Sequence, residues 1–516
     1  MPFLLPFLKL FVWFWVALLA LGRLTGRALP RHAKPLHPTH PADTSDTALG
    51  KALADQVAAH PGLSGVYPLS DGRDAFAARA LLADAAERSI DAQYYIWHDD
   101  ITGRLLLQKL REAAARGVQV RLLLDDNTLA GMDAVLLDLD GLPNIEVRLF
   151  NPFMQRAFRP VGYLSDFGRL NRRMHNKSFT VDNQTTVVGG RNVGDEYFGA
   201  GDGVMFADLD VLAVGPVVEA VSKDFDLYWN SASVFSATDV IHSARKRSDG
   251  AQVRRLPGND VATRAYIQQL EASSLVQKIK DGTLAFDWVP VQLLSDDPVK
   301  GLGQADESQT LLAALRGVMA GAQKQLTIVS PYFVPTENGT ELLASLARRG
   351  VSVAVLTNAL SATDVPVVHA GYAKYRRQLL EAGVALYELK RDATVVPGKV
   401  HGGLTGSSGA SLHAKTFQVD GERLFVGSFN MDPRSAVLNT ELGLLIDDPR
   451  LAGQLQDALT ERGPAGSYHV TLENGQLRWT TQEDGQIKVY DQEPHATPMQ
   501  RAIVWTAGKL PIEWLL

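Results

Sequence analysis

The stretch of sequence that decides the fold is residues 411–441, SLHAKTFQVDGERLFVGSFNMDPRSAVLNTE. Its first nine residues alternate in character, and a strand with this two-residue period places His413 and Lys415 on the same face. Asp420-Gly421 is a strong signal for a two-residue hairpin turn, after which a second apolar run returns. The stretch therefore predicts a β-hairpin that carries an imidazole and an ammonium group side by side.

The same pattern occurs earlier, in residues 174–192, MHNKSFTVDNQTTVVGGRN. His175 and Lys177 share a face of this predicted strand, and Asp182-Asn183 makes the turn. Both copies spell H-x-K-x-x-x-x-D and are followed, at the same offset, by a short glycine-containing pattern that ends in asparagine. The residues that complete this trailing pattern are Gly190 and Asn192 in the first copy and Ser428 and Asn430 in the second. One such match is a weak signal, but two with the same trailing residues argue against chance.

The composition limits the class of protein. The chain has 516 residues, of which 46% are apolar and 21% charged, so it has room for two large globular domains. A formal net charge of -6 argues against a protein that coats nucleic acid electrostatically. The chain has no cysteine, which excludes disulfides, thiolate chemistry and zinc sites built on cysteine.

The two ends of the chain differ from the rest. Residues 1–22, MPFLLPFLKLFVWFWVALLALG, carry one charge, at Lys9, and are interpreted as a hydrophobic membrane anchor. The basic residues that follow would keep the bulk of the chain in the cytoplasm. The rival interpretation is a cleaved signal peptide that ends near Gly22. Residues 23–60 are expected to be a linker. Residues 466–516 are expected to be an appendage, whose last run is either an interfacial amphipathic segment or a tail packed on its own domain.

Strands and helices alternate between these ends, and their order repeats. The elements predicted for the first half are helices at 75–88, 105–116 and 217–229 and strands at 90–97, 118–124, 145–150 and 209–214. Those predicted for the second half are helices at 313–320 and 342–349 and strands at 326–333, 351–356 and 384–389. Gly350 lies 233 positions after Gly117, and His413 lies 238 after His175. This near-constant offset indicates that a whole domain is duplicated.

We therefore predict an α/β fold of two duplicated domains, residues 61–235 and 301–465, joined by a connection at residues 236–300. Each domain would contain a mixed, mostly parallel sheet flanked by helices. Packing about a pseudo-two-fold axis would bring the two His-Lys pairs into one shared cleft.

Two His-Lys pairs in one cleft suit phosphodiester transfer. One imidazole attacks the phosphorus atom, and the other protonates the departing alkoxide and then deprotonates the incoming hydroxyl. The two lysines, with the amides of Asn192 and Asn430, supply positive charge and hydrogen-bond donors for the transition state. This chemistry needs no cofactor and no metal, because the lysines stabilise the charge.

Acidic residues are assigned from their positions. Each histidine needs a partner on its other ring nitrogen. Asp208 and Glu441, which each stand at or just before an apolar strand that follows a motif, are the candidates. Asp182 and Asp420 lie in the turns, and their position suggests that they hold the hairpins rather than do chemistry. The aspartate doublets elsewhere in the chain are interpreted as solvated strand ends and not as metal ligands.

These residues resemble the phospholipase D superfamily, whose mark is a duplicated HxKxxxxD motif, and the resemblance covers nearly all of residues 60–465. It implies two α/β domains that share one active site and form a covalent phosphohistidine intermediate. Stretches such as YYIWHDD, RLNRRMHNKSFTVD, GGRNVGDEYFGAG, DVPVVHAGYA and GASLHAKTFQVD are similar to bacterial cardiolipin synthases, in particular their C-type branch. Carried over by motif, the active-site residues are His175, Lys177, Asp182, His413, Lys415 and Asp420. Gly190 stands where the second copy has Ser428, a difference expected to change only loop packing.

The resemblance implies transfer of a phosphatidyl group from one phospholipid to the hydroxyl of another at the bacterial cytoplasmic membrane. Phosphatidylglycerol is the implied acceptor, phosphatidylglycerol or phosphatidylethanolamine is the implied donor, and nucleic acid is not an expected partner. By the habit of the family, His175 is assigned as the nucleophile and His413 as the acid and base. The alternatives are a phospholipase that releases phosphatidic acid, a metal-independent nuclease, and a non-catalytic membrane scaffold in which both histidines would be dispensable.

Overall fold

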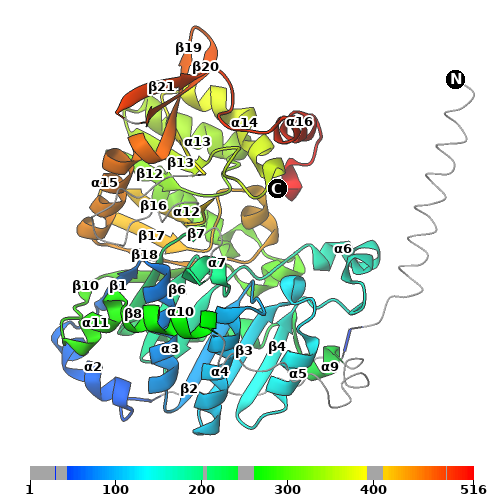
Figure 1. The fold of residues 1–516 in the computed structure, drawn as a ribbon, viewed down its shortest axis with the longest axis vertical. Coiled ribbons are helices and arrows are strands. Elements are labelled where there is room, and N and C mark those ends of the chain that lie inside the picture. The colour runs from blue at the N-terminus through cyan, green and yellow to red at the C-terminus, as the bar shows by residue number, and fades with distance from the viewer. Residues whose placement is uncertain (1–28, 31–42, 201–205, 242–260, 392–410, 484) are drawn as a thin grey trace, which may run out of the picture.

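The computed structural model describes residues 29–30, 43–200, 206–241, 261–391, 411–483 and 485–516. The predicted N-terminal anchor or signal lies outside these residues. Within them, no helix combines the length and the apolar character needed to cross a bilayer. Two domains are stacked along the long axis of the molecule, each with its own large sheet (Figure 1).

The first domain is built on a mixed sheet of nine described strands. In spatial order they are β10 (Asp287–Val289), β1 (Ser64–Leu69), β8 (Asp210–Val214), β6 (Thr185–Gly189), β5 (Ser178–Val181), β2 (Ser89–Tyr94), β3 (Gln119–Asp125), β4 (Ile145–Phe150) and β9 (Val234–Ser236). The accompanying α-helices are α2 (Ala48–Ala59), α3 (Gly72–Ala85), α4 (Ile101–Ala115), α5 (Asp133–Asp140), α6 (Gly162–Leu170), α7 (Asp195–Phe198), α8 (Pro216–Trp229), α9 (Ala237–Val240), α10 (Val261–Glu271) and α11 (Ser274–Lys280). Short 3-10 turns are η1 (Asp126–Thr128) and η2 (Arg159–Val161).

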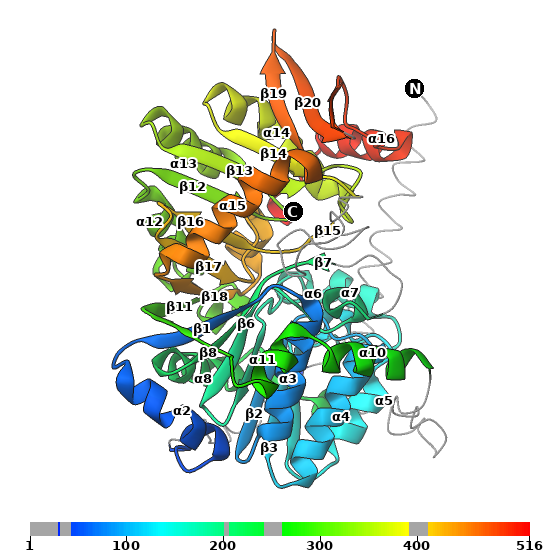
Figure 2. The same cartoon turned by 60° about the vertical axis from the view of Figure 1, so that its left-hand side comes forward.

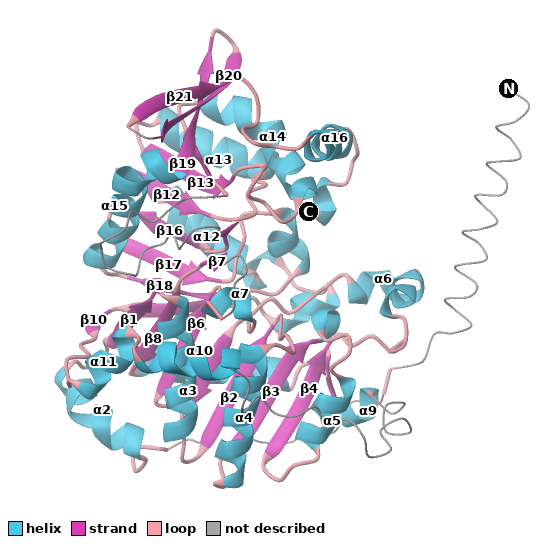
Figure 3. Cartoon of the chain, in the orientation of Figure 1, coloured by secondary structure: helices cyan, strands magenta, loops and turns pink. Residues whose placement is uncertain are grey.

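The second domain repeats this plan on ten described strands. In spatial order they are β11 (Val291–Ser295), β18 (Leu442–Ile446), β17 (Arg423–Gly427), β16 (Thr416–Val419), β12 (Gln325–Val329), β13 (Ser352–Asn358), β14 (Ala385–Leu389), β19 (Ser467–Glu473), β20 (Gln476–Glu483) and β21 (Gln486–Tyr490). Its helices are η3 (Pro298–Leu302), η4 (Glu307–Gln309), α12 (Leu311–Ala320), α13 (Thr336–Arg348), α14 (Pro366–Glu381), the π-helix η5 (Arg434–Leu438), α15 (Pro449–Gly466), α16 (Pro498–Ala507) and η6 (Glu513–Leu515). Figure 3 shows how helices and strands are layered in both domains.

Both sheets are mixed, as predicted, but the expectation that they are mostly parallel is wrong. Parallel pairing is confined to β2, β3 and β4 in the first sheet and to β12, β13 and β14 in the second. The other described ladders of these two sheets are antiparallel. On one side of the parallel strands the reason is the motif itself, because a hairpin joins the sheet beside the first parallel strand and reverses the direction of each strand beyond it. On the other side, β9 and β19 join the sheets in the antiparallel direction.

The hairpin turns form where predicted, with one residue more than expected. Asp182 and Asn183 both have positive φ, a conformation that Asp and Asn adopt more readily than most residues. The amide of Gln184 then donates to the carbonyl of Val181 at 3.0 Å. Strand pairing resumes one residue later, so the loop has three residues, and the second hairpin has the same register.

Segments that we expected outside the two domains join their sheets. In the expected connection, α10 and α11 pack on α3 and β10 pairs with β1, whereas β11 pairs with β18. The chain thus passes from one sheet to the other at Pro290. Part of the expected linker is helix α2, because Leu53 is buried and Leu49 packs on the core of the first domain. In the C-terminal segment, β19, β20 and β21 extend the second sheet, and α16 packs on α14.

Two features hold the domains together. One apolar core contains Val188 and Val211 of the first domain together with Val426 and Leu444 of the second. In addition, a two-stranded parallel sheet pairs β7 (Phe206–Ala207) with β15 (Ser411–Leu412) between the domains (Figure 2). This small sheet lies immediately before Asp208 and His413 in the sequence, so it positions two of the predicted site residues.

Candidate active site

The structure brings the two motif histidines together with the two predicted acids, and it pairs them across the domain boundary. His175 Nδ1 lies 2.8 Å from Oε2 of Glu441, and His413 Nδ1 lies 2.5 Å from Oδ2 of Asp208. The acids are fully buried, and the histidine side chains are 8% and 10% exposed. Both imidazoles are therefore oriented through Nδ1, which leaves Nε2 of each ring as the atom available for chemistry.

The backbone explains why the pairing crosses between domains. The amide of His175 donates to the carbonyl of Thr440 at 2.8 Å, and the amide of His413 donates to the carbonyl of Ala207 at the same distance. In each case the accepting carbonyl belongs to the residue before the acid. The two bridges, 174 with 440 and β7 with β15, are both parallel. Each histidine thus belongs to one domain, and its backbone amide and its ring both bind residues of the other domain.

The two lysines of the motif lie beside their histidines. Lys177 Nζ donates to the carbonyl of His175 at 2.5 Å, and Lys415 Nζ lies 3.0 Å from Nδ1 and 3.2 Å from Nε2 of His413. Both lysines are buried. Burial lowers the pKa of Lys415 and lowers that of Lys177 well below its usual range. Asp208 and Glu441 oppose this effect on both lysines, and an anionic substrate would add further negative charge that favours the ammonium forms.

Glu441 is held by two serine hydroxyls. Ser428 Oγ donates to Oε2 at 2.5 Å, and Ser435 Oγ donates to Oε1 at 2.7 Å. The amide of Glu441 also donates to Asp296, whose carboxylate pairs with Lys300. Every oxygen of the acid therefore has a fixed partner before substrate binds, which fixes the orientation of the histidine in turn.

In the first domain, a glycine replaces this serine for a steric reason. A Cβ atom on Gly190 would lie 2.2 Å from Oδ1 of Asp208. Asp208 is one methylene shorter than Glu441, so its carboxylate must sit closer to the backbone of the neighbouring strand. The expectation that Gly190 affects only loop packing is therefore wrong, because this glycine makes room for the acid that holds His413.

Charge differs between the two His-acid pairs. Burial raises the pKa of Glu441 to about 7 and, with the charge of Lys177, lowers the pKa of His175 well below its usual range. Burial of Asp208 is outweighed by His413 and Lys415, which hold its pKa well below the usual range. Burial and Lys415 lower the pKa of His413 to about 4, although Asp208 acts to raise it. The pair on His413 therefore keeps a full carboxylate charge.

Aromatic rings pack against both histidines, and these rings were not predicted from the sequence. The ring of Tyr95 meets His175 edge to face at a centroid distance of 4.9 Å. Tyr197 and Phe206 both lie 5.1 Å from His413. Tyr95 stands within the quoted stretch YYIWHDD, directly after β2, so its position at a strand end was the available signal. These rings exclude water and restrict ring rotation of the histidines.

The asparagines and turn aspartates occupy different places. The side chain of Asn192 already hydrogen-bonds within the protein, because its amide group donates to Tyr197 and its oxygen accepts from the backbone amide of residue 96. Asn430 is buried, and its Oδ1 has no hydrogen-bond partner among the described residues. Asp182 and Asp420 lie at the far ends of β5 and β16 from the histidines. Their carboxylates accept from backbone amides at 87–89 and 323–325, so geometry gives them a structural role.

The interpretation of the aspartate doublets as solvated strand ends is wrong for several members. Asp125 and Asp126 are fully buried. Asp125 accepts from the guanidinium of Arg173 at 3.1 Å, and Asp126 pairs with Arg156. Buried carboxylates are stable only when paired, and these pairs tie the strand ends to the segment that leads into the first motif.

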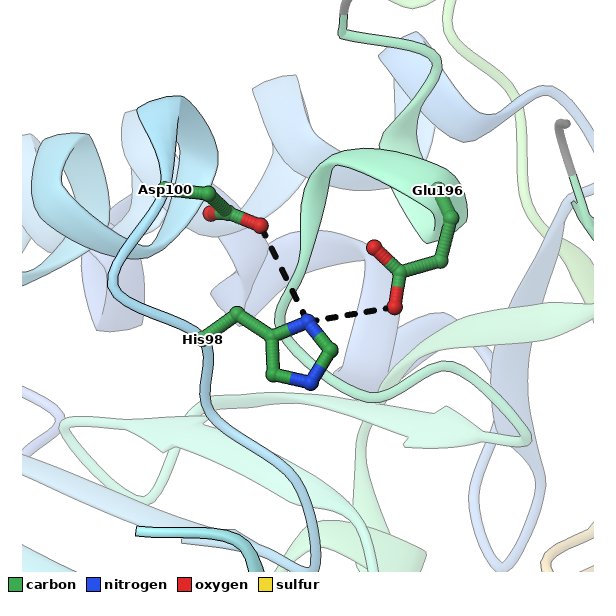
Figure 4. Close-up of side chains that lie close together, drawn as sticks. All are labelled: His98, Asp100 and Glu196. Carbon is green, nitrogen blue, oxygen red and sulfur yellow. Dashed lines mark ion pairs between the residues drawn. The ribbon is translucent and has the colours of Figure 1, made fainter. Parts of the chain in front are cut away.

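Two groups of His, Asp and Glu side chains could be considered as metal sites. His98 Nδ1 lies 3.2 Å from Glu196 Oε1 and 3.9 Å from Asp100 Oδ2 at the edge of the site (Figure 4). Asp100 is already engaged by backbone amides as the N-cap of α4, and Glu196 raises the pKa of His98, which favours an ion pair. The second group, His369 with Glu388 and Glu493, encloses the guanidinium of Arg376, as an ion-pair cluster would.

Comparison with known proteins identifies the family of the chain. Residues 80–229 and 315–462 match the family described as "Cardiolipin synthase, PLD-like domain". Cardiolipin synthase C of Escherichia coli is 47% identical over 470 residues, covering 91% of this chain and 99% of that protein. Cardiolipin synthase A of Pseudomonas syringae is 29% identical, covering 76% of this chain and 67% of that protein. The fold is similar to that of phosphatidylserine synthase from Haemophilus influenzae, with a TM-score of 0.55, 15% identity and coverage of 90% of this chain and 99% of that one. The chain belongs to the phospholipase D superfamily, within the family of cardiolipin synthases with PLD-like domains.

Proposed function

We propose that this chain is a phosphatidyltransferase of the cardiolipin synthase type. It would transfer a phosphatidyl group to the primary hydroxyl of phosphatidylglycerol, with phosphatidylglycerol or phosphatidylethanolamine as donor. The observation that carries the proposal is that two His-acid pairs, each assembled from both domains, lie beside two buried lysines and close enough for Lys415 and His413 to act on His175. The names of its relatives support the lipid class of the substrates.

In the first step, Nε2 of His175 would attack the phosphorus atom of the donor. The bond from phosphorus to the headgroup oxygen breaks as the bond to nitrogen forms, and His413 gives its proton to the departing alkoxide. In the second step, His413 takes the proton of the acceptor hydroxyl, whose oxygen attacks the phosphohistidine and releases His175. Atoms and protons balance over the two steps, and the chain returns to its starting state.

The asymmetry between the two pairs supports this assignment of roles. A general acid must carry a proton before the first step, and a full carboxylate charge stabilises an imidazolium. Asp208 keeps that charge beside His413. Burial favours the neutral form of His175 and weakens the acidity of Glu441, and a neutral imidazole is the nucleophilic form. Binding of an anionic phosphodiester would raise the pKa of His413 and load the acid.

Product analysis tests the function. Membranes containing the full chain receive labelled phosphatidylglycerol, with and without phosphatidylethanolamine, and the products are separated by thin-layer chromatography. We expect cardiolipin from the wild type and from His60→Ala, a surface control that stacks on Trp288, and none from His413→Ala. Phosphatidic acid without cardiolipin would make the chain a hydrolase and overturn the proposal.

Trapping the phosphoenzyme tests the roles. With a labelled donor, we expect His413→Ala protein quenched in detergent at alkaline pH, where the phosphorus–nitrogen bond is stable, to hold label on His175, because attack is slowed but still takes place and return to the acceptor is blocked. His175→Ala should hold none. If only His175→Ala carries label, the roles of the two histidines are reversed.

A further inference from the structure

Large apolar side chains are exposed on two elements that flank the site. In the C-terminal segment, Met499 is 71% exposed, Trp505 66% and Trp514 57%. In the first domain, Phe158 next to η2 is 65% exposed, and Phe167 in α6 is 45% exposed. Such side chains normally pack inside a domain, so a cluster of them in water marks a surface that binds something apolar.

Hydrogen bonds connect the elements that carry the two groups. Arg434 in η5 donates to the side chain of Asn171 at 3.1 Å and to its carbonyl at 2.9 Å, and Asn171 ends α6. The amide of Arg434 donates to the carbonyl of Leu516 at 2.7 Å, at the end of the C-terminal segment. Arg434 therefore stands between α6 and the C-terminal residues. Figure 1 shows α6, α16 and the C-terminus along one edge of the molecule.

The same contacts connect this edge to the chemistry. Ser435, the residue after Arg434, donates to Glu441, and Glu441 holds His175. In the same π-helix, Val437 adds another exposed apolar side chain, at 62%. A chain of hydrogen bonds through Ser435 and Glu441 thus connects η5 to His175, the proposed nucleophile.

The C-terminal segment is a fixed element rather than a loose tail. The carboxylate of Glu513 accepts from Lys374 at 2.6 Å and from Tyr375 at 2.8 Å, both on α14. A Cβ atom on Gly371, also in α14, would lie 2.9 Å from Leu516. One face of the segment is therefore packed on its own domain, while the opposite face presents Trp505 and Trp514 outward. The interpretation as a tail packed on its own domain therefore agrees with these contacts, and the interfacial interpretation stays a prediction.

The chemistry of the exposed face fits a lipid surface. Tryptophan beside a cation is the combination that settles at the boundary between lipid headgroups and acyl chains. The ammonium of Lys509 lies 3.4 Å above the ring of Trp505, and Arg501 is exposed on the same helix. The whole chain has a net charge of -6, which by itself would repel an anionic membrane. Cations next to the exposed apolar side chains would offset this repulsion where the protein meets the lipid.

We propose that this edge is the membrane-docking face of the protein and that its occupant is a phospholipid bilayer containing anionic lipid. The face consists of Phe158, Phe167, Val437, Met499, Trp505 and Trp514. The proposal rests on the proposed function in one respect, since substrates with two acyl chains must leave a bilayer to reach His175. Because side chains of both domains contribute, on either side of Arg434, docking would hold the candidate site next to the membrane.

Depth-dependent quenching tests the face directly. The chain has no cysteine, so single variants Phe158→Cys, Trp505→Cys and Trp514→Cys can each carry one environment-sensitive fluorophore. Matched controls are Ile487→Cys on β21 and Leu227→Cys on α8, which are 75% and 60% exposed. The full-length protein is reconstituted in vesicles of phosphatidylethanolamine and phosphatidylglycerol with brominated acyl chains.

We expect bromolipid quenching about threefold stronger at the three face positions than at the two controls. Quenching equal to that of the controls at all three face positions would overturn the proposal. The proposal would also be overturned if the fluorophores became protected only when a protein fraction is added and not when lipid is added. The measurement does not need turnover. Repeating it in a His413→Ala background separates a failure of the docking face from a failure of the proposed function.

Activity provides a second readout. The double variant Trp505→Ser/Trp514→Ser should form cardiolipin from vesicles about fivefold more slowly, because apolar area that enters the bilayer is lost. Its rate on short-chain phosphatidylglycerol dissolved as monomers should equal that of the wild type, and Ile487→Ser should be unchanged on both. Equal loss on vesicles and monomers would show damage to the site instead and would overturn the proposal.

Discussion

Glu441 of the second domain holds His175 of the first, with 2.8 Å between Oε2 and Nδ1. The reciprocal contact, between Asp208 of the first domain and His413 of the second, is 2.5 Å. Neither domain therefore contains a complete His-acid pair. Any change in how the domains pack would alter both pairs at once, which links domain packing to the geometry of the candidate site.

The first prediction concerns Asp208. Its charge acts to raise the pKa of His413, so Asp208→Asn should lower that pKa further. If His413 is the general acid, the alkaline limb of kcat/KM moves to lower pH, and the maximal rate falls about 100-fold as the ring loses its orientation. The measurement is the pH profile of transfer, with the exposed Asp281→Asn as control. A limb that stays in place in Asp208→Asn but moves in Glu441→Gln would assign the acid to His175.

The second prediction concerns Gly190. An added methyl group would lie 2.2 Å from the carboxylate of Asp208 and displace it. We expect Gly190→Ala to lower the transfer rate about 100-fold, since an unsupported histidine loses tautomer and orientation. Gly317→Ala is the matched control, because a methyl group there meets nothing within 4 Å. Comparable rates for the two variants would show that Asp208 can shift without consequence.

The third prediction separates the turn aspartate from the chemistry. Asp182 is fully buried and accepts from the backbone amides of residues 87, 88 and 89. We expect Asp182→Ala to destabilise the fold by about 2–4 kcal/mol, because three amides lose a charged acceptor. Denaturant unfolding measures this, with Asp55→Ala on the surface of α2 as control. Activity per folded molecule should stay near that of the wild type, and a selective loss of it would give Asp182 a direct role.

The fourth prediction concerns stability and pH. Burial raises the pKa of Asp224 to about 7, and its Oδ2 has no hydrogen-bond partner within the described chain. A carboxyl group whose pKa is higher in the folded than in the unfolded protein does not change the free energy of unfolding below about pH 4, where it is neutral in both. Between about pH 4 and pH 7 it lowers the free energy of unfolding progressively, because it ionises in the unfolded chain first. Asp224→Asn should therefore be more stable than the wild type by about 1–2 kcal/mol at pH 8, with the difference vanishing near pH 4. Thermal unfolding across this range is the measurement. A constant difference at all pH values would show that the charge is not the cause.

Much of the fold was predictable because its signals are local. The period of the strands, the glycines after α4 and α13 and the Asp-Asn and Asp-Gly turns each depend on neighbours in sequence. Strand direction was not predictable in this way. Whether β5 pairs with β2 or with another strand depends on contacts about 90 residues apart, so the parallel core was expected to be larger than it is.

For the site, the residue types were predictable and the steric reason for Gly190 was not. A glycine in place of a serine reads as a minor loop change until Asp208 is seen against it. The burial of Asp125 beside Arg173 was equally hidden, since the pair is separated by 48 positions. Charge pairs between distant segments leave no periodic pattern in a sequence.

The sequence by itself determined that two β-hairpins and their His-Lys pairs exist, that each is followed by an acid, and that the two copies arose from one domain. The prediction that the pairs lie within a strand is wrong, because the structure places them in the segments directly before β5 and β16. Only the tertiary structure decided which acid serves which histidine. The reason is physical: the carbonyls of Thr440 and Ala207 receive the amides of His175 and His413 across the domain boundary. A contact between residues more than 200 positions apart is set by how two apolar sheets pack, and no local preference of the chain encodes it.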